Sequence, residues 1–119
     1  MIYDTQGRIC LGKQLSEEMG FNQKITVRLV YEGNKIFRLV PTSQLTDKDR
    51  VVGYNIKIDE KNRIIIPKEV RDMYTKHLLV YGARNDGYLY LEFQASKQEE
   101  RMTSAIEALT NELQKFRRG

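Results

Sequence analysis

Two arginines at matched positions are the residues of this chain best suited to bind another molecule. Arg8 and Arg63 each stand four residues after an aspartate, Asp4 and Asp59 respectively. A guanidinium group is a planar, permanently charged fork that pairs with phosphate oxygens or with the edge of a guanine base. A carboxylate at the start of a loop accepts hydrogen bonds from the backbone of that loop. The spacing therefore predicts two tight turns, each of which projects an arginine.

The residue before each arginine fits such a turn. Gly7 precedes Arg8 and Asn62 precedes Arg63, and these two residue types adopt positive φ most readily. Each arginine has two possible roles. It either contacts a bound partner or only supports its own loop by pairing with the aspartate, and the sequence leaves both roles open.

The two turns belong to an internal repeat. Residues 4–15, DTQGRICLGKQL, align without gaps on residues 59–70, DEKNRIIIPKEV, at a constant offset of 55. A unit too small to bury its own hydrophobic face can bury it against its twin. We therefore expect one folded body made of two related halves.

The elements that position the turns follow the same order in both copies: strand, strand, helix and β-hairpin. In the first copy the expected elements are a short leading strand and then a strand, a helix that Gly20 ends, and a hairpin, at residues 1–3, 8–11, 13–19, 25–31 and 35–40. In the second copy they lie at residues 51–58, 63–66, 68–74, 78–83 and 88–93. The predicted organisation is a first repeat at 1–45, a second repeat at 46–95 and an appended segment at 96–119.

The appended segment has the pattern of an amphipathic helix. Ser96 followed by Glu99 makes a capping box, and helix-forming residues continue to residue 118. The apolar positions are spaced 4, 3, 4 and 3 residues apart, which is a heptad seam, and they are Met102, Ile106, Leu109, Leu113 and Phe116. This seam either packs on the chain's own body or pairs with a second helix in a homodimer, and both alternatives stay open.

Composition bounds the class of protein. The chain has 119 residues, of which 40% are hydrophobic, and a formal net charge of +4. No apolar run is long enough for a membrane helix or a signal peptide, so we expect a soluble, cytoplasmic protein. The lone Cys10 aligns with Ile65, and we expect it to be a small buried hydrophobic residue.

The inventory of reactive side chains does not favour catalysis. There is one histidine, His77, and one cysteine, and no Cys/His spacing typical of a metal site. A glycine-rich phosphate loop is also absent from the sequence. We expect no enzymatic activity, no cofactor and no bound metal.

The second copy resembles a known signature. It matches the pattern D-x-K-G-R-x-x-x-P-x-x-x-R of the MraZ proteins, with Asn62 in place of the glycine, at Asp59, Lys61, Arg63, Pro67 and Arg71. The stretch is also similar to AbrB and SpoVT regulators and to MazE-type antitoxins. The resemblance covers residues 1–94 and is weaker in the first copy, where Gly12 replaces the proline and Ser16 the second arginine.

This resemblance implies a mostly β (α+β) fold, a swapped-hairpin or double-split β-barrel of two tandem β-β-α-β-β repeats, to which the C-terminal helix is added. It also implies a bacterial transcriptional regulator that binds double-stranded DNA sequence-specifically and is associated with the nucleoid. The turns would be held by Asp4, Gly7, Asp59 and Asn62. The DNA-binding residues that the resemblance and its sequence neighbourhood imply are Arg8, Lys13, Lys57, Lys61, Arg63, Lys68 and Arg71.

Two other functions remain alternatives. An antitoxin would have a toxin protein as its main partner, although antitoxins of this kind generally have one copy and an extended tail. An assembly module would keep the fold without binding DNA. Within the regulator hypothesis, the first copy lacks the second arginine and carries Glu17 and Glu18, so we expect it to present the less positive half of the surface.

Overall fold

A computed structural model describes residues 1–82 and 86–117, and side chains as far as residue 110. The chain forms seven strands, three α-helices and one short 3-10 helix within these residues. In chain order they are β1 (Arg8–Cys10), α1 (Lys13–Met19), β2 (Thr26–Gly33), β3 (Ile36–Pro41), η1 (Thr42–Gln44), β4 (Val51–Lys57), β5 (Arg63–Ile65), α2 (Lys68–Met73), β6 (Leu78–Gly82), β7 (Leu89–Phe93) and α3 (Lys97–Arg117).

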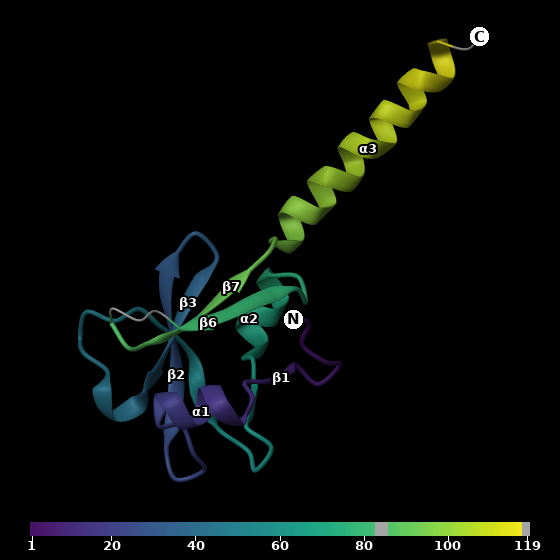
Figure 1. Cartoon of the computed structure of the whole chain (residues 1–119). Helices are drawn as coiled ribbons and strands as arrows, with labels where there is room; N and C mark the ends of the chain where they lie inside the picture. Colours follow the sequence, from purple (N-terminus) through teal and green to yellow (C-terminus); the bar gives the residue numbers. More distant parts are fainter. Residues whose placement is uncertain (83–85, 118–119) are drawn as a thin grey trace.

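The strands form two antiparallel sheets. One has five strands in the order β4-β2-β3-β7-β6, and the other is a two-stranded ribbon of β1 and β5 (Figure 1). The mostly β class with a C-terminal helix is confirmed, whereas the expected closed barrel is wrong for the described residues, which form an open sheet. Strand β4 covers the outer side of β2, but the equivalent residues 1–3 give only the bridge Ile2↔His77 beside β6. The sheet therefore stays open beside β6 in the described residues.

The two copies pair chiefly with each other. Strand β1 pairs with β5, β2 with β4, and β3 with β7, so three of the strand pairs join the first copy to the second. In the ribbon, Ile9 lies opposite Ile64, and these two residues are equivalent in the repeat. The ribbon therefore has a local two-fold relation centred on this pair.

Both copies contribute to a single core. Ile9 and Ile64 are 2% and 1% exposed, and they pack in one cluster with residues of the five-stranded sheet and of α2. Full burial of an isoleucine side chain contributes about 1.5–3 kcal/mol, so this central pair is a substantial part of the stability. Neither copy's hydrophobic face is buried without the other.

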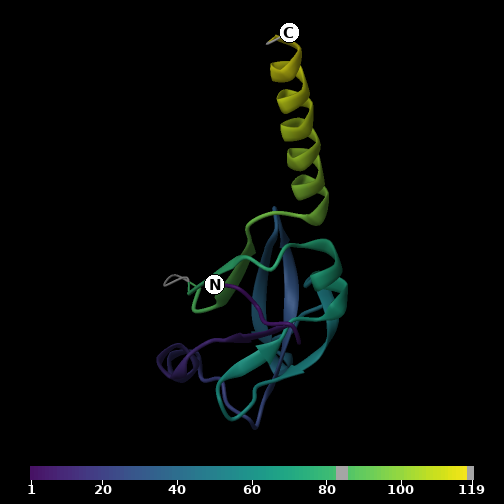
Figure 2. The same ribbon diagram turned by 90° about the vertical axis from the view of Figure 1, so that its right-hand side faces the viewer.

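Helix α3 extends away from the β body in both views (Figures 1 and 2). Its predicted capping box is confirmed: the Ser96 hydroxyl accepts a hydrogen bond from the Glu99 N–H at 3.0 Å, and the Glu99 carboxylate accepts one from the Ser96 N–H at 3.3 Å. Lys35 of the hairpin β2–β3 forms an ion pair with Glu99 at 3.0 Å. These contacts anchor only the first turn of the helix.

The predicted seam of α3 is exposed where its side chains are described. Met102, Ile106 and Leu109 are 58%, 61% and 60% exposed, so these residues do not pack on the chain's own body. Leu113 and Phe116 lie outside the described side chains. None of the helices in the described ranges is both long enough and apolar enough to cross a membrane.

Candidate functional site

Each predicted turn is built around an aspartate. The Oδ1 atoms of Asp4 and Asp59 each accept two backbone hydrogen bonds at 2.8–2.9 Å, one from the second residue after the aspartate and one from the arginine. The last residue before each arginine has positive φ, 80° at Gly7 and 58° at Asn62. The two turns therefore have the same hydrogen bonds and the same backbone geometry.

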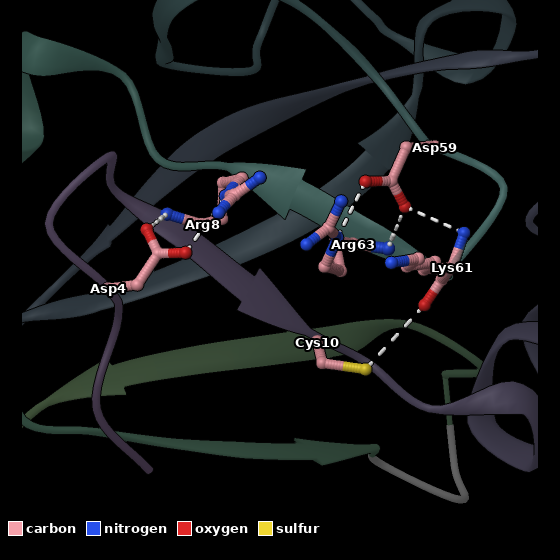
Figure 3. A network of polar contacts seen from close by, with 6 residues as sticks. All are labelled: Asp4, Arg8, Cys10, Asp59, Lys61 and Arg63. Carbon is pink, nitrogen blue, oxygen red and sulfur yellow. Dashed lines mark hydrogen bonds and ion pairs between the residues drawn. The ribbon is translucent and has the colours of Figure 1, made fainter.

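The second oxygen of each aspartate orients the arginine. Arg8 Nε donates to Asp4 Oδ2 at 2.8 Å, and Arg63 Nε donates to Asp59 Oδ2 at 2.7 Å (Figure 3). Within the described part of the chain, these bonds use Nε and leave the two terminal nitrogens of each guanidinium group without a hydrogen bond. Each arginine thus supports its loop and still presents its fork.

The ribbon brings the two arginines to one face. Arg8 lies opposite Ile65, and Arg63 lies opposite Cys10, on either side of the buried central pair. Since side chains alternate along a strand, both arginines point to the ribbon face that looks away from the core. Figure 3 shows their side chains lying between Asp4 and Asp59.

The same alternation corrects the expectation for Cys10. It is exposed rather than buried, and its Sγ donates to the Lys61 carbonyl at 3.6 Å. Its repeat partner Ile65 is also 42% exposed. Cys10 stands two residues after Arg8, and that spacing was the signal that it shares the outer face.

A hollow of about 510 Å³ adjoins the arginines. It brings together three of the predicted DNA-binding residues, Arg8, Lys57 and Arg63. Two further polar residues line it that were not predicted, Gln6 and Gln23. Gln6 is the repeat partner of Lys61, which was the available signal, whereas Gln23 arrives from the loop after α1 and nothing in its local sequence marks it.

The other predicted lysines lie apart from this hollow. Lys13 begins α1 and lines a second hollow of about 590 Å³ together with Glu17 and Glu60. Lys61 is exposed in the second turn, and Lys68 is exposed at the start of α2. In the described residues, no group of His, Cys, Asp and Glu side chains could hold a metal ion.

Arg71 lies against the turn of the other copy. A Cβ atom added to Gly7 would be 2.5 Å from Arg71 Cδ and 2.7 Å from its Nε. The Nε atom is buried and has no hydrogen-bond partner in the described residues. The expected division into a less positive first copy and a more positive second copy is therefore not a division in space, because α2 of the second copy lies on the first turn.

The two copies differ at the positions equivalent to Arg71 and Gly7. The helix residue equivalent to Arg71 is Ser16, which is 1% exposed, and the turn residue equivalent to Gly7 is Asn62. The long arginine lies against the turn that lacks a side chain. The first copy therefore has the smaller residue at both positions, and Gly7 leaves room for the arginine of the second copy.

Both turn carboxylates ionise more readily than usual. The backbone hydrogen bond from Arg8 is the largest cause that lowers the pKa of Asp4. For Asp59, burial works to raise the pKa, but the hydrogen bonds from Arg63 and Lys61 together outweigh it and the pKa is lowered. The charged form of each aspartate is therefore the form that holds the turn.

Replacing Asp59 by Asn is expected to remove an acid-sensitive part of the stability. The folded-state pKa lies below the reference value of 3.8, so this contribution is present above that value and is lost as the pH falls through the folded-state pKa. Urea midpoints at about pH 6 and about pH 3 should differ less in Asp59→Asn than in the unchanged chain. Asp47→Asn, in the exposed connector, is the control. An unaltered pH dependence in Asp59→Asn would contradict the role of the carboxylate.

Replacing Gly7 by Asn is expected to destabilise the chain through its contact with Arg71. Asn62 shows that asparagine can adopt the positive φ of the equivalent turn. The main effect should therefore be the clash of the new side chain with Arg71, which should lower the free energy of unfolding by about 1–3 kcal/mol. Adding Arg71→Ser should restore most of the loss in free energy of unfolding. Additive effects of the two substitutions in a double-mutant cycle would show that the residues are not coupled.

Known proteins offer no match from which function could be transferred. A scan of protein-family models, a search of curated proteins and a search of solved structures each found no match to this chain. The duplicated turns, their two arginines and the adjoining hollow are the features from which function has to be inferred.

Proposed function

We propose that this protein is a bacterial transcriptional regulator of the AbrB/MraZ type that binds double-stranded DNA sequence-specifically. The observation that carries the proposal is the register of the ribbon, which puts Arg8 and Arg63 on one exposed face about a local two-fold. A DNA duplex has two-fold related strands, so a pair of equivalent turns matches its symmetry. The mild excess of positive charge is compatible with this partner.

The ribbon has suitable dimensions and side chains for the major groove. That groove admits a two-stranded β-ribbon, and arginine pairs there with guanine O6 and N7. The aspartates hold each Nε and leave the terminal nitrogens to make this contact. Gln6 and Gln23, which line the same hollow, carry the amide that can pair with adenine.

The remaining predicted residues take supporting roles in this proposal. Lys57 lies beside the arginines, and Lys13, Lys61 and Lys68 are exposed, so they are placed to contact phosphates as point charges. Arg71 supports the first turn through its contact with Gly7. The contributions of the lysines would be independent of sequence, whereas those of the two turn arginines would set specificity.

The pairing of strands between copies supports a swapped-hairpin arrangement of the two repeats. The hairpin of the first copy is flanked on both sides by strands of the second copy: β4 lies beside β2, and β7 lies beside β3. We include this arrangement in the proposal because it explains why the two turns meet in one ribbon. A single chain then supplies both halves of the DNA-binding surface.

Arg8→Ala and Arg63→Ala are expected to weaken binding to a target duplex and to relax its sequence preference. Each lost base contact should cost about 1–3 kcal/mol, and each lost phosphate contact should reduce the salt slope by about 0.9. Targets recovered from genomic DNA, titrated at several salt concentrations, give both quantities. Arg50→Ala is the matched control, because Arg50 is an exposed arginine that directly precedes β4, at the opposite end of that strand from Lys57. Unchanged affinity in both turn variants would reject the site.

Helix α3 is proposed to join two chains into a homodimer. Its exposed residues Met102, Ile106 and Leu109 continue a heptad pattern that suits a partner helix. The doubled chain would present two ribbons and gain avidity on paired DNA sites. This proposal is separate from DNA binding and has its own test.

Replacing Ile106 and Leu109 together by Glu should disrupt the helix pairing, because it would bring like charges into the seam. The measured mass of the full chain by light scattering should fall, while DNA binding by one ribbon persists. Ser104→Glu, on another side of the helix, controls for added charge. A mass that is the same for all three proteins would discard helix pairing.

A further inference from the structure

The two turns have the same backbone hydrogen bonds but a different side chain at one exposed position. Gln6 and Lys61 are equivalent in the repeat, and each donates its backbone N–H to the aspartate of its own turn at 2.9 Å. Both residues are exposed. At this position the first turn therefore presents a neutral amide, whereas the second turn presents a positive charge.

The local two-fold relation of the ribbon places these two residues on opposite sides of its axis. The relation that exchanges Ile9 with Ile64 also exchanges Gln6 with Lys61, because the offset of 55 residues is constant through both turns. The turn arginines are exchanged in the same way and are alike. The two sides thus share an arginine and differ in the residue two positions before it.

A second difference comes from the segment that follows each helix. Residues 20–25 join α1 to β2, whereas the shorter segment 74–77 joins α2 to β6. The longer segment carries Gln23, an exposed residue that lines the same hollow as Gln6. The shorter segment, Tyr-Thr-Lys-His, has no amide side chain. Only the first copy therefore supplies an amide from this part of the repeat.

The loop that carries Gln23 has a defined conformation. Phe21 at its base is 4% exposed and packs in the core. At its tip, Asn22 Oδ1 accepts a hydrogen bond from the Lys24 N–H at 2.8 Å. Gln23 lies between these two fixed points, so its backbone is positioned before a partner binds.

The hollow beside the ribbon brings both amides close to cationic groups. Gln6 and Gln23 line it together with the two turn arginines and Lys57, whereas Lys61 lies outside it. A glutamine amide has a donor and an acceptor, which together pair with N7 and N6 of adenine. An ammonium group has donors only, so it cannot accept a hydrogen bond from adenine N6. The amide side of the ribbon is therefore suited to a base that the Lys61 side is not.

We propose that Gln6 and Gln23 give the two halves of the DNA site different base preferences, so that the protein binds its target in one orientation. This inference rests on the proposed DNA-binding function. The half-site that meets the two amides favours an adenine beside a guanine, because glutamine reads the adenine and arginine reads the guanine. The half-site that meets Lys61 keeps the guanine and has a phosphate contact in place of the adenine contact.

Selection of bound sequences from a random duplex library by the full chain tests this inference. The unchanged chain should recover a site in which only one half prefers an adenine. Gln6→Lys makes the first turn like the second, and Gln23→Ala removes the other amide. Each should reduce the preference for adenine in that half about tenfold, as measured by titration of the recovered duplex and its single-base variants. Gln98→Lys, at an exposed glutamine on α3, is the matched control and should change neither half.

The reverse exchange should act on the other half of the site. Lys61→Gln makes the second turn like the first, so this half should gain a preference for adenine. The salt slope should fall by about 0.9, because one phosphate contact is lost. The turn substitutions keep the backbone N–H that binds the aspartate, and circular dichroism checks that each variant is folded.

The outcomes separate this inference from the function on which it rests. A recovered site with the same preference in both halves would overturn the inference while leaving sequence-specific DNA binding in place. An adenine preference that neither Gln6→Lys nor Gln23→Ala reduces would have the same effect. Recovery of no common sequence by the unchanged chain would reject the proposed function, and the inference with it.

Discussion

The carboxylate at the start of each turn is the interaction on which the rest of the surface depends. One oxygen closes the turn through two backbone N–H groups, and the other holds the arginine by Nε. A single ionised group therefore fixes both the path of the backbone and the direction of a flexible side chain. Each arginine side chain is already ordered before a partner binds, so binding costs less conformational entropy. This preorganisation favours contacts of defined geometry, such as a bidentate contact of the guanidinium group, over nonspecific attraction between charges.

Duplication supplies the symmetry of the surface, and packing preserves it where the sequences have diverged. The two turns keep the same hydrogen bonds, and the buried central pair Ile9–Ile64 fixes the register of β1 against β5. A register slip by one residue would turn both arginines toward the core. Divergence is tolerated where one copy's helix meets the other copy's turn, as in the contact of Arg71 with Gly7.

Local features of this fold could be predicted from the sequence, and features that depend on distant segments could not. Three predicted features depend only on a few neighbouring residues, and the structure has all of them: the Asp-to-Arg turns, the helix end at Gly20 and the Ser96 capping box. The expectation of a closed barrel was wrong because closure depends on pairing between distant segments, and in the described residues β6 has only the bridge Ile2↔His77 on its outer side. The expectation that Cys10 is buried was wrong because it rested on residue type, whereas strand alternation puts Cys10 on the exposed face with Arg8. Gln23 lines the hollow only because tertiary packing brings its loop there.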